Sequence, residues 1–273
     1  MSVYSVRGNE VKNEYTTEDI TLESCHNLKG EVIHTIGEFV VMTYNVQWWS
    51  KINAITSVTD TIINTHNPDV IGFQEYKDKA TYLKGLGFTD IQISNSKYAT
   101  NLKCVASKHK LFEVSEKTFD VHDVQTRSYQ KMYIKVGSKK ICLINVHLDY
   151  QPQDTQKSQA EELFELVQSE EYFIIMGDLN TFCKSVSDAD YIDMMAQFDN
   201  AGYHLANCSE QHGFLDTWSD GVDETATDWW QTDNIITSSN ISINKVIVDK
   251  TKITAATGQN IDHLPLIARL TIN

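Results

Sequence analysis

The sequence predicts a layered α/β sandwich whose sheet is at least partly antiparallel. From Phe39 onward, short apolar runs such as FVVMTY and YFIIMG alternate with longer amphipathic stretches, which is the pattern of strands interleaved with helices. Two further runs, QKMYIKV and KKICLINV, flank the turn signal VGSK at hairpin distance and predict an antiparallel pair. Helices over a partly antiparallel sheet favour a sandwich over an all-parallel, doubly wound fold.

The first helix is predicted between the runs FVVMTY and DVIGFQ. Ile55, Val58, Ile62 and Ile63 fall at helical spacing, and Pro68 prevents the helix from continuing into DVIGFQ. This segment is therefore expected to cross from one strand to the next.

A second helix is predicted over TQKSQAEELFELVQSEE. The segment is rich in strong helix formers and places Leu163, Leu166 and Val167 on one face. It leads into the strand-like run YFIIMG, and a last apolar strand follows IDH near the carboxyl terminus.

The domain organisation predicted is an amino-terminal extension, residues 1–37, followed by one domain over residues 38–273. The extension is polar, and length alone also allows two small domains. The longest apolar runs are far shorter than the about 20 residues that a membrane span requires, and the first part of the chain lacks an apolar signal core. We expect a cytoplasmic protein without a membrane span or an obligate protein partner, while export by an unmarked route stays open.

Charge and cysteine content narrow the function further. The formal net charge of −14 argues against strong non-specific binding to a polyanion, although it leaves nucleic acid open as a substrate. Clustered carboxylates can be offset locally by a bound divalent cation. The 5 cysteines are widely spaced and form no CxxC, so neither a disulfide framework nor a zinc site is predicted, and a reducing compartment is the simplest interpretation.

Polar side chains stand at the ends of the apolar runs. Because the ends of buried strands converge on one rim of a sheet, these groups are expected to form a ligand site. Oxygen-rich donors suit a hard cation such as Mg²⁺. No phosphate loop, nucleophile elbow, HExxH or GxGxxG motif is present. The residues at strand ends are Asn45, Glu75, His147, Asp178 with Asn180, and Asp262 with His263.

Six segments, VMTYNVQWW, IGFQEY, INVHLDY, IIMGDLNTF, TDNIITS and IDHLPLI, resemble in order the motifs of the endonuclease/exonuclease/phosphatase superfamily, the DNase I-like metal-dependent phosphoesterases. The resemblance extends roughly from Phe39 to Leu270. It implies a four-layered α-β-β-α sandwich with largely antiparallel or mixed sheets. It also implies Mg²⁺ as cofactor, with Mn²⁺ or Ca²⁺ as alternatives. On this resemblance Glu75 is the principal metal ligand, and Asn45 and Asp262 lie close to the same ion or its waters.

The resemblance also assigns catalytic roles. Asp178 matches the acid that orients or deprotonates the attacking water, and Asn180 the amide that positions the phosphate or that water. His263 matches the imidazole that contacts the scissile phosphate, and Asp233 the carboxylate that orients it. His147 matches a second histidine near the phosphate.

Two further residues carry weaker matches. Arg127 stands where relatives often place a phosphate-contacting arginine, and Asp149 belongs to the HLD pattern as a supporting residue. Structural roles remain alternatives for several of the site residues. Asp178 can cap a helix that begins near Asn180, and His147 can be a hydrogen-bonded core residue.

The tryptophan pair Trp48-Trp49 follows Asn45 at the end of the first segment, and the pair Trp229-Trp230 lies just before Asp233. Adjacent residues of a strand point to opposite faces, so one member of each pair is expected in the core, and the other is a candidate to line the substrate cleft.

The predicted function is metal-assisted hydrolysis of P–O bonds by a phosphodiesterase or endonuclease, with a phosphoester substrate that includes DNA among the candidates. Two alternatives stay open. One is a phosphatase or phosphodiesterase that acts on a small phosphorylated sugar, a lipid headgroup or a cell-envelope phosphopolymer. The other is a non-catalytic binding module that retains the fold.

Overall fold

The computed structural model describes residues 3–7, 10–15, 24–26, 32–35, 38–47, 52–76, 80–94, 102–122, 126–219, 229–251 and 262–273. Two compact units are distinguished, Met1–Glu38 and Phe39–Asn273. The first unit holds two short antiparallel hairpins, β1 with β2 and β3 with β4. The second holds the sheets and helices on which the site is built.

The elements follow the chain in this order: β1 Val3–Arg7, β2 Glu10–Tyr15, β3 Ser24–His26, β4 Val32–Thr35, β5 Phe39–Asn45, α1 Ile52–His66, β6 Val70–Gln74, α2 Ala80–Gly85, β7 Asp90–Ile93, β8 Lys103–Ser107, β9 Phe112–Thr118, β10 Ser128–Val136, β11 Lys139–His147, α3 Gln153–Val167, β12 Phe173–Asp178, a π-helical turn Tyr191–Met195, α4 Ala196–Asn200, β13 His204–Leu205, β14 Trp218–Ser219, β15 Trp229–Trp230, β16 Asp233–Thr237, β17 Ile241–Val248 and β18 Leu266–Ile272.

Two six-stranded sheets form the centre of the second unit, in the orders β13-β16-β12-β11-β10-β9 and β17-β18-β5-β6-β8-β7. Each sheet is antiparallel except for one central pair, β11 with β12 in the first and β5 with β6 in the second. Each parallel pair is connected through one long helix, α3 or α1. Since the strands of a parallel pair end at the same edge, each sheet brings two strand ends to one rim.

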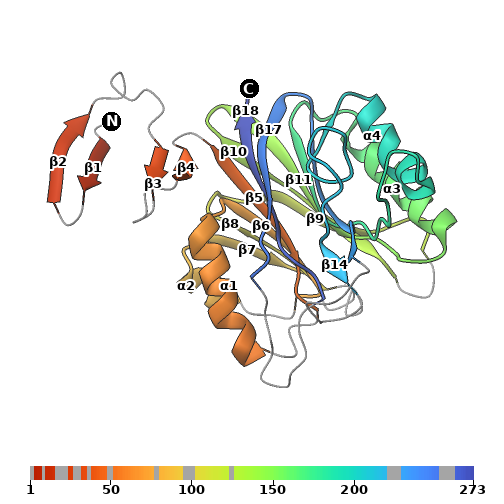
Figure 1. Cartoon of the computed structure of the whole chain (residues 1–273), viewed down its shortest axis with the longest axis horizontal. Coiled ribbons are helices and arrows are strands. Elements are labelled where there is room, and N and C mark those ends of the chain that lie inside the picture. Colours follow the sequence, from red (N-terminus) through yellow and green to blue (C-terminus); the bar gives the residue numbers. More distant parts are fainter. Residues whose placement is uncertain are drawn as a thin grey trace. The chain divides into compact units, whose positions relative to one another are not determined.

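Three hydrophobic clusters define the layers. The side chains between the sheets form one cluster. A second joins β5, β6 and β8 to Ile62 and Ile63 of α1 and to Leu83 of α2. The third joins β11 and β12 to Leu163 and Val167 of α3. Figure 1 shows the resulting arrangement, with α1 and α2 on one side of the paired sheets and α3 and α4 on the other.

The two sheets approach each other closely where β6 crosses β12. A Cβ atom at Gly72 would lie 2.8 Å from Met176 Cγ and 2.9 Å from Asn145 Oδ1, so only glycine fits there without displacement. Asn145 is itself buried and accepts a hydrogen bond from Gln74 Nε2 at 2.8 Å. The end of β6 therefore lies against both β11, through Asn145, and β12, through Met176.

The predicted fold class is confirmed, with two mixed sheets between helical layers. The helix predicted before Pro68 is α1, although the side chains of Ile55 and Val58 lie outside the described residues. The hairpin predicted around VGSK is β10 paired antiparallel with β11. Within the described residues, no helix is both long and apolar enough to cross a membrane.

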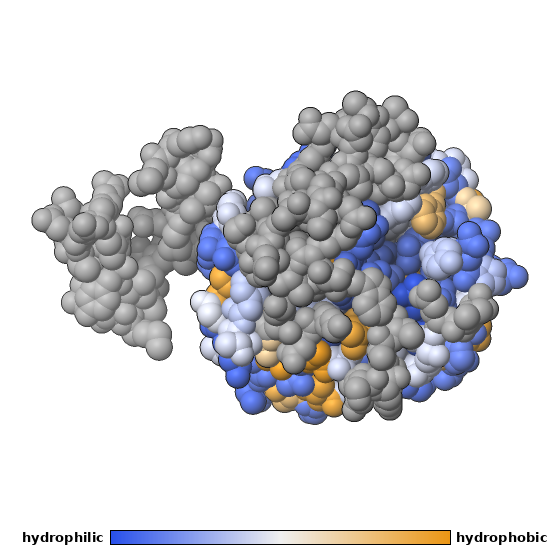
Figure 2. Space-filling model, turned by 90° about the horizontal axis from the view of Figure 1, so that it is seen from below, coloured by the Kyte–Doolittle hydropathy of each residue, from blue (hydrophilic) through white to orange (hydrophobic). Residues whose placement is uncertain are grey.

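When the molecule of Figure 1 is turned by 90° and seen from below, the described part of its surface is mostly hydrophilic (Figure 2). The main group of hydrophobic residues in this view lies near its lower edge, and smaller groups are scattered elsewhere (Figure 2). The large hydrophobic residues that are exposed in the described chain are few, namely Val114, Val121, Tyr150 and Ile192.

Candidate active site

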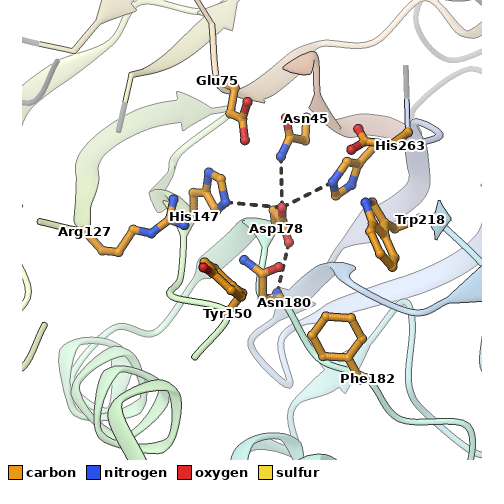
Figure 3. Close-up of a pocket in the computed structure, with 11 residues that line it drawn as sticks. Asn45, Glu75, Arg127, His147, Tyr150, Asp178, Asn180, Phe182, Trp218 and His263 are labelled. Atoms are coloured by element: carbon orange, nitrogen blue, oxygen red, sulfur yellow. Dashed lines mark hydrogen bonds and ion pairs between the residues drawn. The ribbon is translucent and has the colours of Figure 1, made fainter. Parts of the chain in front are cut away.

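One pocket of about 430 Å³ is lined by eight of the nine candidate site residues. They are Asn45, Glu75, Arg127, His147, Asp178, Asn180, Asp262 and His263, and Tyr150, Phe182 and Trp218 complete the wall. Figure 3 shows the polar groups gathered around Asp178. Asp233, the ninth, contacts His263 from outside this lining. The polar strand ends of both sheets therefore meet in one place.

Three polar residues at this rim adopt a left-handed backbone conformation. The φ angle is 45° at Gln47, 54° at Glu75 and 51° at Asn180. Each follows the end of β5, β6 or β12 by one or two residues. For residues other than glycine this conformation costs about 1–3 kcal/mol, and such residues cluster at functional sites. The backbone therefore turns sharply where each strand delivers its polar side chain.

Asp178 is the centre of the hydrogen-bond network. Its Oδ2 accepts a hydrogen bond from Asn45 Nδ2 at 2.9 Å and lies 3.4 Å from His147 Nε2 and 3.6 Å from His263 Nε2 (Figure 3). Its Oδ1 accepts the backbone N–H of Asn180 at 3.0 Å. Burial raises the pKa of Asp178 to about 7, although the charge of His263 acts in the opposite direction. A carboxylate with that pKa exchanges protons near neutral pH.

His263 is held by a carboxylate on its far side. Its Nδ1 lies 2.9 Å from Asp233 Oδ2, which also accepts a hydrogen bond from Thr232 Oγ1 at 2.9 Å. Burial alone would lower the pKa of His263, but the carboxylates of Asp233 and Asp178 outweigh it and raise the pKa to about 10. The imidazole is therefore a cation at neutral pH, and its Nε2 faces Asp178.

His147, unlike His263, is uncharged at neutral pH. Burial lowers its pKa well below 6.5, and the positive charges of Arg127 and His263 lower it further. The imidazole is therefore neutral at pH 7, and its buried Nδ1 has no hydrogen-bond partner among the described residues. Arg127 is fixed by Asp149, whose Oδ1 accepts a hydrogen bond from Nε at 3.1 Å and whose Oδ2 accepts one from Gln159 Nε2 at 2.8 Å.

Glu75 and Asp262 form a second acidic group at the same pocket. Gln47 Nε2 donates a hydrogen bond to Asp262 Oδ2 at 3.1 Å, and Asn45 lines the pocket beside Glu75 (Figure 3). Burial raises the pKa of Glu75, while the charge of His263 lowers it. Among the described residues, Asp262 Oδ1 and Gln47 Oε1 are buried and lack a hydrogen-bond partner. The acids here are less completely paired than Asp178.

The tightest group of ligand atoms in the described chain is a different one. Asp178, Asp233 and His263 each offer an atom within 4.8 Å of the others. These three residues already pair with one another, however, through the contacts of His263 with both carboxylates. The side chains of these three residues are therefore already satisfied in part by one another, whereas Glu75, Asn45 and Asp262, the ligands expected from the sequence, line the same pocket.

The aromatic part of the wall was not predicted as a unit. The ring of Phe182 lies 6.1 Å from that of Trp218 and 5.5 Å from that of Trp230. Lys184 Nζ lies 4.1 Å from the Trp230 ring centroid. Tyr150 also lines the pocket and is half exposed. The one sequence signal for Phe182 and Tyr150 is that they lie close to the motifs GDLN and HLD. Their contacts join segments that are distant in the sequence, so no local pattern predicts them.

One structural alternative is resolved by the geometry. No helix begins at Asn180, so Asp178 is the last residue of β12 and not a helix cap. Of the tryptophan pairs, Trp230 packs against Phe182 as an aromatic support of the wall. Trp48, Trp49 and the side chain of Trp229 lie outside the described residues.

The fold and site agree with a match to a family model. The model of the Endonuclease/Exonuclease/phosphatase family matches residues 42–248. The chain belongs to this family, whose members are divalent-metal-dependent hydrolases of phosphoester bonds, and it is a phosphoester hydrolase. The family resemblance of the six sequence motifs is thereby confirmed. No curated protein matches the chain.

Solved structures share the fold at low sequence identity. An endonuclease/exonuclease/phosphatase from Bacteroides vulgatus is 14% identical with a TM-score of 0.67, over 86% of this chain and 99% of that one. D. rerio TDP2 complexed with a single strand DNA product is 15% identical with a TM-score of 0.66, over 86% and 99%. A Bacteroides thetaiotaomicron mannosyl-6-phosphatase is 14% identical with a TM-score of 0.61, over 85% and 99%. At these identities the likeness concerns the fold alone.

Proposed function

We propose that the chain is a Mg²⁺-dependent phosphodiesterase, with endonuclease activity as the first candidate, that hydrolyses a P–O bond by attack of water. The observation that carries the proposal is the position of Asp178, which contacts Asn45, His147 and His263 in one pocket beside Glu75. This set supplies a proton acceptor, a cation and a neutral imidazole within reach of one phosphate.

The donor set fits a divalent cation. Glu75 and Asp262 face the pocket together, Asp262 Oδ1 is buried without a hydrogen-bond partner among the described residues, and burial raises the pKa of Glu75. Carboxylate and amide oxygens are the ligands that Mg²⁺ prefers, and Glu75, Asn45 and Asp262 would hold it. When bound, the ion would supply charge stabilisation for the phosphate and for the leaving oxygen.

The proposed base is Asp178. The hydrogen bonds from Asn45 Nδ2 and the Asn180 N–H fix its carboxylate, and its pKa of about 7 keeps a proton-accepting form available at neutral pH. Water held against Oδ2 can transfer its proton to this oxygen as it attacks phosphorus. We therefore assign Asp178 to water activation.

The remaining residues bind and orient the phosphate. His263, kept protonated by Asp233, presents a positive N–H to a phosphate oxygen, and the Arg127 guanidinium lines the same pocket. His147 stays neutral and can donate a hydrogen bond through Nε2. The Asn180 side chain donates through Nδ2 to the Leu148 carbonyl at 2.9 Å, which leaves its Oδ1 to position the water.

The first experiment is hydrolysis of a generic phosphodiester, bis(4-nitrophenyl) phosphate, with Mg²⁺ and then with EDTA. We expect turnover only with the metal. Equal rates in both solutions would reject metal-assisted hydrolysis. No turnover on any phosphoester, together with a cellular role that survives Glu75→Ala and Asp178→Asn, would favour the non-catalytic binding module.

A second candidate is hydrolysis of a small phosphoester, such as a phosphorylated sugar or a lipid headgroup. It is favoured by the net charge of −14 and by Phe182 and Trp218, which place aromatic rings in the lining of a pocket of about 430 Å³. Nicking of supercoiled plasmid, compared with phosphate release from small organic phosphates under the same conditions, separates the two. A nuclease should prefer the plasmid strongly.

A further inference from the structure

Two cysteines that are far apart in the sequence meet next to the catalytic strand ends. Cys183 Sγ lies 2.8 Å from Cys208 Sγ, at a sequence separation of 25 residues. Both side chains are fully buried in the cluster beneath α3. We propose that Cys183 and Cys208 are a site of covalent cross-linking, which closes to a disulfide when the chain folds in the presence of a disulfide oxidant.

The position of the pair links it to the two catalytic carboxylates. Cys183 follows Asp178 by five residues, on the segment that carries Asn180 and Phe182 into the pocket wall. Cys208 follows Asn207, whose Nδ2 donates to the Asp233 carbonyl at 3.0 Å. A bond between the sulfurs therefore ties the segment after Asp178 to the segment that supports Asp233.

Neighbouring contacts already hold these segments in register. Thr181 Oγ1 donates to the Gln231 carbonyl at 2.6 Å, and Cys208 Sγ lies 3.6 Å from the same oxygen. The Thr181 hydroxyl and the Cys208 sulfur thus meet at one carbonyl just before β16, and Cys183 Sγ reaches this point through Cys208 Sγ. The hydrogen bond of Thr181 holds the segment of Cys183 beside the segment before β16, so the folded chain keeps the two sulfurs adjacent.

The timing of the reaction follows from burial. Burial raises the pKa of the Cys208 thiol well above 9, so in the folded chain it is a poor nucleophile and is shielded from solvent. The cross-link is therefore made while the segments are still exposed during folding. Once closed, it is protected from small reductants by the same burial.

Glutathione disulfide serves as the oxidant in a balanced exchange. The Cys183 thiol loses its proton, its thiolate attacks one glutathione sulfur, and the first glutathione leaves as a thiolate. The Cys208 thiolate then attacks the Cys183 sulfur of this mixed disulfide and releases the second glutathione. Two protein thiols are oxidised to one disulfide, and one glutathione disulfide is reduced to two thiols.

The test refolds the full chain from denaturant in a glutathione redox buffer and in excess reductant. After unfolding and alkylation, we expect the oxidised sample to contain one peptide pair joined through Cys183 and Cys208, and an intact mass lower by about 2 Da before alkylation. Closing a loop of 25 residues constrains the unfolded chain, so the Tm of the oxidised form should be higher by about 5–10 °C.

Three variants make the test specific. Cys183→Ala and Cys208→Ala should each abolish the cross-link and the dependence of Tm on reductant. Cys142→Ala removes an equally buried thiol of the same cluster and should retain both. Alkylation of Cys183 and Cys208 as free thiols in oxidised wild type, or their pairing with other cysteines, would overturn the proposal. The mass measurement on wild type decides even if a variant fails to fold, and it needs no substrate, so it is independent of the proposed activity.

Discussion

The two halves of the pocket differ in how completely their acids are paired. Asp178 receives hydrogen bonds from Asn45 and Asn180 and faces two imidazoles, and Asp233 is joined to His263. On the other side, Glu75 and Asp262 face the same space, and the one hydrogen bond that described residues donate to their carboxylates comes from Gln47. Each half keeps one buried carboxylate oxygen without a partner among the described residues, Asp233 Oδ1 in the first and Asp262 Oδ1 in the second. We call the group of Asp178, Asp233 and His263 the paired half, and the group of Glu75 and Asp262, which we propose binds a divalent cation, the underpaired half.

This difference predicts two separate kinds of loss. Damage to the paired half should slow the chemical step while metal affinity survives. Damage to the underpaired half should weaken metal binding first, with turnover recoverable at high metal concentration. Four changes test the contrast, from the largest expected effect to the smallest.

Asp178→Asn should have the largest effect on turnover. The amide cannot accept the proton of the attacking water, so kcat should fall by about 10²–10⁴-fold while Mg²⁺ affinity changes little. Steady-state rates and a metal titration measure the two quantities. Asp154→Asn, which changes an exposed acid of α3, is the matched control and should leave both near wild type. A loss of metal affinity as large as the loss of kcat would show that the two halves do not have separate functions.

The same substitution has a predictable effect on stability in EDTA. The folded pKa of Asp178 is raised from 3.8 to about 7, so its contribution to stability is present below pH 3.8 and is lost as pH rises through about 7. Wild type should therefore be less stable at pH 8 than at pH 5 on account of this group. Asp178→Asn should raise the unfolding free energy at pH 8 by on the order of 1–4 kcal/mol, measured by urea unfolding.

Glu75→Gln should weaken metal binding by at least about 10–100-fold, because it removes the principal negative charge of the underpaired half. Calorimetric titration with Mn²⁺ measures the affinity, and turnover should recover as the metal concentration is raised. Glu165→Gln, an exposed acid of α3, is the control. An unchanged Mn²⁺ affinity would show that Glu75 is not a ligand.

Asp233→Asn should reduce kcat by about 10–100-fold and move the alkaline limb of activity to lower pH. Asp233 is the chief group that raises the pKa of His263 from 6.5 to about 10. The stability contributed by this raised pKa is present below pH 6.5 and is lost as pH rises through about 10, so it shrinks in the variant. NMR titration of the imidazole checks the pKa directly. A pKa of His263 that stays near 10 contradicts the assignment.

Deletion of residues 1–37 should have the smallest effect. Every described residue of the pocket lies within Phe39–Asn273, so kcat should remain within a factor of about two. The measurement is a rate assay on the shortened chain beside the full chain. A loss of activity with the pocket unit still folded would show that the extension contributes to catalysis.

The sequence was most informative where a polar residue stands directly at the end of a strand. Asn45, Glu75, His147 and Asp178 could be predicted because each ends or follows an apolar run that is easy to recognise. Their convergence follows from the two parallel pairs, whose strands end at one rim. The fold class was predicted by the same alternation of runs, and the four layers by the family resemblance.

Contacts between distant segments could not be predicted in this way. Gln47 donates a hydrogen bond to Asp262, 215 residues further along the chain, and the ring of Phe182 lies near that of Trp218, on a different segment. Cys183 and Cys208 show no informative spacing, yet their sulfurs lie 2.8 Å apart. Such pairings depend on sheet order and on loops, which leave no periodic pattern in the sequence.

The left-handed backbone at Gln47 and Glu75 has a consequence for evolution in the laboratory. Glycine reaches this conformation without steric cost, so a library selected only for heat resistance should accumulate glycine at these two positions. The variants selected in this way should have a higher Tm and no catalytic activity. A screen for turnover should instead enrich the original glutamine and glutamate. Opposite outcomes of the two screens would show that thermal stability and catalytic activity favour different residues at these positions.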